Sequence, residues 1–160
     1  MPNLQLEDLC LWEVNLSLTN ALKMSKAILR MKQVSLAQTY LTTHQLNILT
    51  AAIHGTKESE QKLEYLNLSG NNFAEVDETT LSSSCLCLET VMLRYCRLKP
   101  SHLDSLFNKT LQDRRRRLIY CDITGNTLMK QNMEPLKLAL EYVNFIKDDV
   151  TYNLVQIYDI

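Results

Sequence analysis

The sequence predicts an α/β fold built as an array of about five repeated units, each a short strand followed by a helix. Three observations predict it. The chain of 160 residues contains 29 Leu but only 3 Gly and 3 Pro. One apolar pattern recurs five times along the chain. The spacers between its copies carry apolar residues at helical spacing.

The recurring pattern is L-x-x-L-x-L-x-x-N-x-L, with Cys or Thr also accepted at the Asn position. Its third apolar residue falls on Leu11, Leu36, Leu68, Leu93 and Ile123. The copies are therefore 25, 32, 25 and 30 residues apart. The L-x-L alternation predicts a short strand whose apolar side chains point into the core. The predicted repeats form a single domain over 1–160 and cover residues 6–30, 31–62, 63–87, 88–117 and 118–146.

The polar position of the pattern lies where the chain leaves each strand. An Asn side chain there can bond backbone groups of the turn and of the adjacent repeat, which would otherwise be unpaired. Asn71 and Asn126 suit this role best, and Thr39 and Cys96 are workable substitutes. Val14 cannot form such bonds, so we expect the first repeat to be irregular or terminal.

The first two spacers predict one helix each. Residues 17–29 form the first, with the expected inward side chains Leu18, Leu22, Ile28 and Leu29. Thr43 is expected to cap the second helix, which should end near Gly55. Its expected inward side chains are Leu46, Leu49 and Ile53.

The later spacers carry further signals. Residues 75–87 are short and rich in Ser, so their helical pattern is the weakest. Pro100 suits the first turn of a helix, whose expected inward side chains are Leu103, Leu106, Phe107 and Leu111. Asn132 is expected to cap a helix from Met133 that buries Leu136, Leu140, Val143 and Ile146. Within 147–160, Tyr152–Ile157 alternates and is interpreted as a closing strand after a turn at Asp148-Asp149.

With these motifs in place, the chain resembles the ribonuclease-inhibitor-like class of leucine-rich-repeat proteins. The stretches LEYLNLSGNNF, LETVMLRYCRL and LIYCDITGNTL carry the resemblance, which covers roughly residues 6–146. It implies a curved solenoid with parallel strands on the concave face and helices on the convex face. It also implies a protein-binding module of the cytoplasm or nucleus. The class serves many roles, from inhibitors to immune receptors and ubiquitin-ligase receptors, so the partner and pathway stay open.

Charge and motif content favour a binding module over an enzyme. Lys and Arg number 17 against 18 Asp and Glu, and this net charge of -1 argues against a nucleic-acid partner. No stretch reaches the roughly 18 apolar residues of a membrane helix, so no membrane partner is predicted. We find no phosphate loop, nucleophile elbow or acid–base set, and so predict no catalytic residue, no metal site and no cofactor. His44, His54 and His102 are expected to be solvated.

The five Cys are an odd, scattered set, which favours reduced thiols over a disulfide framework. Cys85 and Cys87 precede a predicted strand, and Cys96 and Cys121 fall on pattern positions, so all four are expected to be buried. Cys10 falls on an outward strand position and is the one candidate reactive thiol.

The outward positions of the predicted strands form rows across the repeats. One row is Asp8, Gln33, Tyr65, Thr90 and Tyr120. The second is Cys10, Ser35, Asn67, Met92 and Asp122, and the third is Trp12, Ala37, Ser69, Arg94 and Thr124. Trp, Tyr and Arg most often dominate interface energy. The predicted partner-binding residues on this concave face are Trp12, Tyr65, Asn67, Met92, Arg94, Tyr95, Tyr120 and Asp122.

Two other roles stay open at this stage. The pattern begins at Leu6, which leaves no room for a polar capping element. We therefore expect the chain to belong to a longer protein, in which it could be a structural segment of a larger solenoid scaffold. The run Arg114, Arg115, Arg116 and Arg117 should be a solvated loop. It could also dock an acidic protein or nucleic acid, or act as a nuclear import signal.

Overall fold

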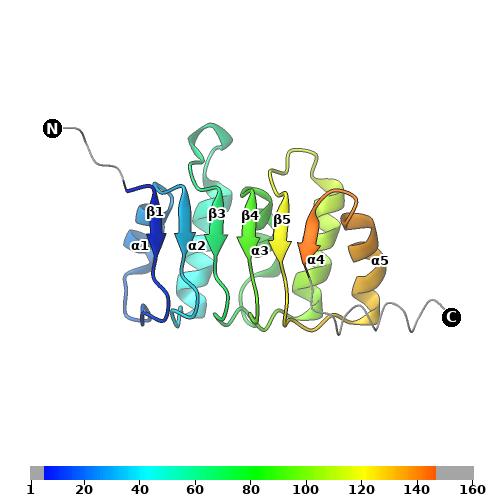
Figure 1. The fold of residues 1–160 in the computed structure, drawn as a ribbon, viewed down its shortest axis with the longest axis horizontal. Coiled ribbons are helices and arrows are strands. Elements are labelled where there is room, and N and C mark those ends of the chain that lie inside the picture. The colour runs from blue at the N-terminus through cyan, green and yellow to red at the C-terminus, as the bar shows by residue number, and fades with distance from the viewer. Residues whose placement is uncertain (1–5, 147–160) are drawn as a thin grey trace.

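A computed structural model describes residues 6–146, in which strands and helices alternate along the chain (Figure 1). The strands are β1 (Asp8–Cys10), β2 (Gln33–Ser35), β3 (Tyr65–Asn67), β4 (Thr90–Met92), β5 (Tyr120–Asp122) and β6 (Asn144–Ile146). The α-helices are α1 (Ala21–Ile28), α2 (Thr43–Gly55), α3 (Glu78–Leu86), α4 (Pro100–Gln112) and α5 (Lys130–Ala139). A 3-10 turn, η1 (Glu58–Glu60), lies between α2 and β3. We call each strand with its following helix a unit.

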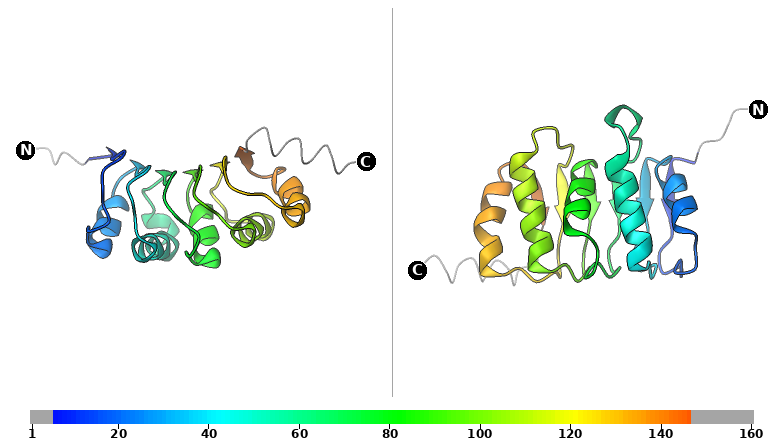
Figure 2. Two further views of the ribbon diagram at one scale, coloured as in Figure 1. Left: turned by 90° about the horizontal axis from the view of Figure 1, so that it is seen from below. Right: turned by 180° about the vertical axis from the view of Figure 1, so that it is seen from behind.

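All six strands form one parallel sheet whose spatial order follows the chain order, β1 to β6. The helices form a single layer on one side of this sheet (Figure 2). Parallel neighbours need a crossover connection, and here each crossover contains one helix. The α/β class predicted from the sequence is therefore confirmed.

The core lies between the sheet and the helix layer. The middle residue of each of the strands β2 to β6 is buried: Val34, Leu66, Val91, Cys121 and Phe145. The next inward position along the chain adds Leu36, Leu68, Leu93 and Ile123, all buried. Near the last strand, the Phe145 ring meets the Phe107 ring of α4 edge-on, with centroids 5.1 Å apart. The period-2 pattern therefore assigned the inward positions of β2 to β5 correctly, whereas β6 was not predicted.

The first helix is shorter than predicted and turns a different face inward. Asn20 caps it, because the Asn20 side chain accepts a hydrogen bond from the Lys23 amide. Leu18 therefore precedes the helix and is fully exposed, and Leu22 is 54% exposed. The buried face has i, i+3, i+4, i+7 spacing and consists of Ala21, Met24, Ser25 and Ile28. The expectation that Leu18 and Leu22 face inward is wrong.

The middle helices agree more closely with the predictions. The second is capped by Thr42 rather than Thr43, and it buries Leu46, Leu49 and Ile53 as expected before ending at Gly55. The helix from Pro100 buries Leu103, Leu106 and Phe107, while Leu111 is half-buried. The Ser-rich spacer also contains a helix, α3, over residues 78–86.

The last helix differs most from its prediction. It begins at Lys130, so Asn132 lies in its first turn instead of before it. It ends at Ala139, which leaves Leu140 exposed outside the helix, while Leu136 and Val143 are buried as expected. Ile146 belongs to strand β6. This strand was not predicted, because its apolar residues continue the helical spacing of the preceding segment. The predicted closing strand at 152–157 and the turn at Asp148-Asp149 lie outside the described residues.

Two buried asparagines bridge neighbouring units where the chain leaves the sheet. The Asn71 side-chain amide donates to the backbone oxygens of Leu36 and Leu68, and its oxygen accepts from the Leu41 amide. Asn126 forms the equivalent bonds between the fourth and fifth units. As expected, Thr39 and Cys96 take the Asn position in other units, with shorter side chains. The Thr39 hydroxyl donates to the Leu36 oxygen, and the Cys96 thiol contacts the Leu68 oxygen at 3.4 Å.

A second set of bonds ties helix starts to the preceding unit. Gln45, His102 and Asn132 each occupy the third position of a helix, and each accepts a hydrogen bond from the amide of its own N-cap residue. Each also donates to a backbone carbonyl of the preceding unit. At α3 the direction reverses, because the Asp77 amide donates to the Asn47 side chain of α2. Gln45, His102 and Asn132 can form both bonds because each side chain offers one acceptor and one donor.

The buried Leu93, which directly follows β4, provides a test of the core assignment. Leu93→Ala should lower the free energy of unfolding by about 2–5 kcal/mol, because it leaves a cavity between sheet and helices. Leu22→Ala is the matched control, since the same atoms are removed from an exposed helix position, and it should change stability by less than about 0.5 kcal/mol. Urea unfolding of both variants measures this. Equal losses would contradict the assigned register.

The helix-start bonds provide a second test. His102 is 2% exposed; its Nδ1 accepts from the Lys99 amide, so Nε2 carries the proton donated to the Val76 oxygen. His102→Leu should cost about 2 kcal/mol or more, because both backbone groups lose their partner. His102→Gln keeps an acceptor and a donor, as Gln45 does in α2, and should cost clearly less. The assignment fails if the two variants unfold at the same urea concentration.

Candidate interaction surface

Among residues 6–146, all helices lie on one side of the sheet, and none lies over the other face (Figure 2). The strand register aligns its outward residues into the two rows predicted from the sequence. Asp8, Gln33, Tyr65, Thr90 and Tyr120 pair in succession and are continued by Asn144 of β6. Cys10, Ser35, Asn67, Met92 and Asp122 pair in the same way. Parallel sheets are usually covered on both faces, so an uncovered face of this kind requires an explanation.

The backbone pairing continues beyond the strands and creates the third predicted row. The amide of Gly70 donates to the Arg94 oxygen, and the amide of Tyr95 donates to the Thr124 oxygen, each at 2.8 Å. Equivalent bonds join the first three units. The row contains Trp12, Ala37, Ser69, Arg94 and Thr124, of which Ala37 is buried. Trp12 is 62% exposed at the end of the row nearest the N-terminus.

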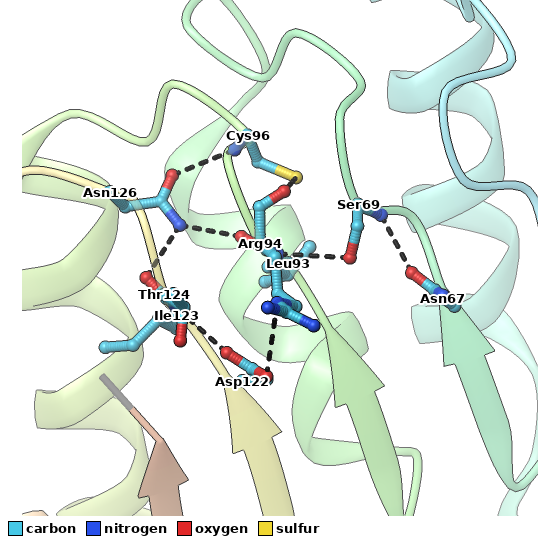
Figure 3. A network of polar contacts seen from close by, with 9 residues as sticks. All are labelled: Asn67, Ser69, Leu93, Arg94, Cys96, Asp122, Ile123, Thr124 and Asn126. Carbon is cyan, nitrogen blue, oxygen red and sulfur yellow. Dashed lines mark hydrogen bonds and ion pairs between the residues drawn. The ribbon is translucent and has the colours of Figure 1, made fainter. Parts of the chain in front are cut away.

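A polar network fixes the centre of this face (Figure 3). The Arg94 Nε lies 3.6 Å from the Asp122 carboxylate, which also accepts a hydrogen bond from the Thr124 amide. The Arg94 amide donates to the Ser69 hydroxyl, and the Ser69 amide donates to the Asn67 side chain. The Asp122 residue is 5% exposed, whereas the Arg94 side chain is half-exposed. Asp122 therefore orients Arg94 and offers little of its own surface to a partner.

Tyr95 reaches the face through a backbone conformation that few residues adopt. Its φ is +52°, and the corresponding positions Glu13, Gln38, Gly70 and Gly125 also have positive φ. The Tyr95 ring lies against the backbone of Gly125, where an added Cβ would overlap the ring. Gly125 therefore provides both the left-handed turn and the space for Tyr95. Tyr95 was predicted from the sequence as a contact residue, but the dependence of its ring position on Gly125 was not.

The remaining aromatic residues differ in exposure. Tyr65 and Tyr120 are half-buried within their row. Partial burial raises the pKa of the Tyr65 hydroxyl, and the hydrogen bond with Asn67 opposes that rise. Tyr40, which was not predicted, is an exposed aromatic in the turn after β2, with φ +57°. A signal existed, because Tyr40 immediately follows the polar pattern position, as Arg97 does in the fourth unit.

The arginine run divides into two exposed and two engaged residues. Arg114 and Arg115 are exposed, as predicted. Arg116 stacks on the Tyr142 ring at 4.5 Å from its centroid, and Arg117 forms an ion pair with Glu89 at 3.1 Å. The expectation of four solvated charges is therefore wrong for Arg116 and Arg117, because each has a partner in an adjacent segment. Two cations of the run remain available to solvent.

The structure places most of the cysteines and histidines as predicted, with two exceptions. Cys85, Cys96 and Cys121 are buried and Cys10 is exposed, as predicted, but Cys87 is only half-buried. Burial in apolar surroundings raises the pKa of the Cys85 and Cys96 thiols to about 12 and that of Cys121 well above its usual range. His44 and His54 are exposed as expected, whereas the buried His102 contradicts the expectation because it bonds two backbone groups.

Searches for known sites and relatives add no assignment. Among residues 6–146, no three His, Cys, Asp or Glu side chains are grouped so that they could hold a metal ion. Within the same residues, the helices are too short or too polar for any to cross a membrane. No protein-family model matches the chain, and no curated protein matches its sequence.

The thiol environments predict a graded reactivity. At pH 8, Cys10 should react with iodoacetamide fastest, because only its thiol is exposed. Cys85, Cys96 and Cys121 should react only as fast as the protein opens, since their raised pKa values keep them protonated. Mass spectrometry of tryptic peptides over time measures the order, with urea-unfolded protein as the control. Early labelling of Cys121 would contradict the core assignment.

Proposed function

We propose that this chain is a curved leucine-rich-repeat solenoid of the ribonuclease-inhibitor-like class that binds a protein or peptide through its uncovered strand face. The observation that carries the proposal is that face itself: six in-register parallel strands that no helix of residues 6–146 covers, with exposed Trp12, Arg94 and Tyr95. Large aromatic and Arg side chains on an exposed surface are typical of interface hot spots. The resemblance of the sequence supports the same assignment.

Binding would rely on a surface that is ordered before the partner arrives. Arg94 is held by Asp122, and the Tyr95 ring rests on Gly125, so neither loses much side-chain freedom in a complex. The aromatic rings would exclude water, and the polar residues between them would select the partner's hydrogen-bonding groups. The proposal includes no catalytic step.

The size of the face bears on what it can bind. Six strands at a spacing of about 4.8 Å span about 24 Å, and three rows two residues apart span about 13 Å. The projected area is on the order of 300 Å², whereas a standard interface buries about 800 Å² on each partner. We therefore expect the partner to reach past the rows onto the turns that carry Tyr40 and Arg97, which are exposed.

Two alternatives have their own support. A structural segment of a larger scaffold is favoured by the exposed apolar residues of the first unit, such as Leu18. Electrostatic docking of an acidic protein or nucleic acid is favoured by Arg114 and Arg115, which are exposed. The five unpaired cysteines support a place in the cytoplasm or nucleus under each of the three roles.

The face is tested with the triple variant Arg94→Ala, Tyr95→Ala, Tyr120→Ala as bait in affinity capture from cell lysate, read by mass spectrometry. We expect at least one protein that wild type recovers to be lost, because the central anchors are removed. The matched control is Arg114→Ala, Arg115→Ala, which should recover that protein at wild-type yield. Circular dichroism melting verifies that both variants fold. Loss with the control and retention with the triple variant would assign binding to the arginine loop instead.

A further inference from the structure

The uncovered strand face carries few charges in its central part. This part, the central face, consists of β2 to β5 with the turns that follow them: 33–40, 65–72, 90–97 and 120–127. Among these residues, the Asp, Glu, Lys and Arg side chains are Arg94, Arg97 and Asp122. Asp122 is 5% exposed, whereas both Arg residues are exposed. The charge that the central face offers to a partner is therefore cationic.

Arg94 keeps hydrogen-bond donors open at the middle of this surface. Its Nε lies 3.6 Å from the Asp122 carboxylate (Figure 3). Within residues 6–146, no hydrogen bond involves either of its two Nη atoms, and the side chain is 48% exposed. A guanidinium presents paired N–H groups in one plane, which match the two oxygens of a carboxylate. The Nη groups can therefore receive an acceptor that a partner supplies.

Asp122 holds Arg94 without occupying those donors. The Asp122 carboxylate accepts a hydrogen bond from the Thr124 amide at 3.0 Å, which fixes the carboxylate beside the Arg94 side chain. The turn that carries Arg94 is fixed as well, because its amide donates to the Ser69 hydroxyl of the preceding unit. A donor that is oriented beforehand loses little side-chain entropy on binding. Asp122 is thus a positioning residue for a cation that faces the partner.

The other acids around the central face are engaged or distant. Glu64, Glu75 and Glu89 each form an ion pair with a Lys or Arg. The Asp77 carboxylate caps α3. The acids in and beside β1 are Glu7, Asp8 and Glu13. β1 lies three strand spacings, or about 14 Å, from β4, which exceeds the Debye length of about 8 Å at physiological ionic strength. These acids therefore do not neutralise Arg94.

A second cation follows in the same turn as Arg94. Arg97 is exposed, and none of the ion pairs within residues 6–146 includes it. The exposed Tyr95 lies between the two cations in sequence, and Asn67 and Met92 form a neutral pair in the neighbouring row. The central face thus combines two cations with aromatic, apolar and amide groups. This combination suits an acidic segment that also carries apolar side chains.

We propose that the central face binds an acidic segment of a partner polypeptide, with one Asp or Glu carboxylate of that segment docked on the Nη groups of Arg94. This inference rests on the proposed function, because it names the chemistry of the partner that the uncovered face binds. Two parallel N–H···O bonds would fix the register of the segment on the strands, and Arg97 would attract its remaining negative charge. A basic partner is disfavoured, because Asp122 is buried.

Two other occupants fit the central face less well. The phosphates of a nucleic acid also match a guanidinium, but tight binding neutralises several phosphates at once, and the central face offers two cations. A second copy of the chain, laid face to face, would set these cations against each other. An acidic polypeptide is the occupant that the charge of the face favours.

The deciding variant removes the Arg94 ion pair without changing the net charge. Arg94→Gln alone would leave Asp122 buried without its counter-charge, which is costly. Arg94→Gln, Asp122→Asn replaces both charges, and the substituted amide oxygen can still accept from the Thr124 amide. The matched control is Glu89→Gln, Arg117→Gln, which removes an ion pair of the same kind at the opposite end of the strands. Circular dichroism melting verifies that both variants fold.

The test is selection of a displayed library of random 16-residue peptides on the purified chain, followed by fluorescence-anisotropy titration of synthetic copies. We expect enriched peptides to be net negative. Replacing one particular carboxylate by its amide should weaken binding to wild type about tenfold, but binding to Arg94→Gln, Asp122→Asn less than about twofold. A direct contact predicts this non-additivity, and a purely structural role of Arg94 does not. Glu89→Gln, Arg117→Gln should bind every peptide as wild type does.

The proposal is overturned if enriched peptides lack Asp and Glu, if carboxylate effects are equal in wild type and Arg94→Gln, Asp122→Asn, or if nothing is enriched. Tyr95→Ala, Tyr120→Ala separates this failure from failure of the proposed function. Peptides that this variant weakens, but that are indifferent to loss of Arg94, bind the face through other groups. Peptides indifferent to both variants bind elsewhere, which contradicts the proposed function as well.

A nucleic acid is tested in parallel with a 16-nucleotide oligothymidine. We expect it to bind wild type more weakly than the selected peptides do. Binding of the oligothymidine that is lost in Arg94→Gln, Asp122→Asn, without any acidic peptide selected, would overturn the proposal in favour of a nucleic-acid partner.

Discussion

The uncovered face depends on the bonds by which buried Asn71 and Asn126 hold the backbones of successive units together. A strand of three residues offers few backbone bonds, and the turn after it leaves carbonyls buried between units. Each such group left unpaired would cost about 1–3 kcal/mol. Asn71 satisfies them between the second and third units and Asn126 between the fourth and fifth, and backbone bonds join the remaining turns. The rows of outward residues stay aligned because these bonds fix the spacing of the turns.

The opposite end of each connection is secured differently. Gln45, His102 and Asn132 tie the start of their helices to the unit before, so sheet and helix layer cannot slide independently. Three unrelated residue types perform this task because the geometry requires only one acceptor and one donor. In the second, fourth and fifth units, the strand end and the helix start are thus both anchored, and the strand face is ordered in the absence of a partner. Such order lowers the entropy cost of any complex it forms.

Local pattern predicted the strand centres and the two outward rows, because a period of two leaves one possible register around Leu68 or Leu93. It failed at boundaries, where a single cap decides the outcome: Asn20 delays α1 and thereby exposes Leu18. Strand β6 was missed since its apolar residues continue a helical spacing. The candidate residues were found by position, but the burial of Asp122 under Arg94 arises only from neighbouring strands, which no local pattern encodes.

The order of the strands has a consequence for how such a protein can change over generations. Each strand lies between its chain neighbours, and among the helices each contacts those before and after it. Duplicating one strand and its helix would therefore insert a segment without rerouting any connection. The face would widen by one strand spacing, about 4.8 Å, and all existing side-chain neighbours except those at the insertion would persist. Its breadth is thus a heritable quantity that can grow or shrink in fixed steps.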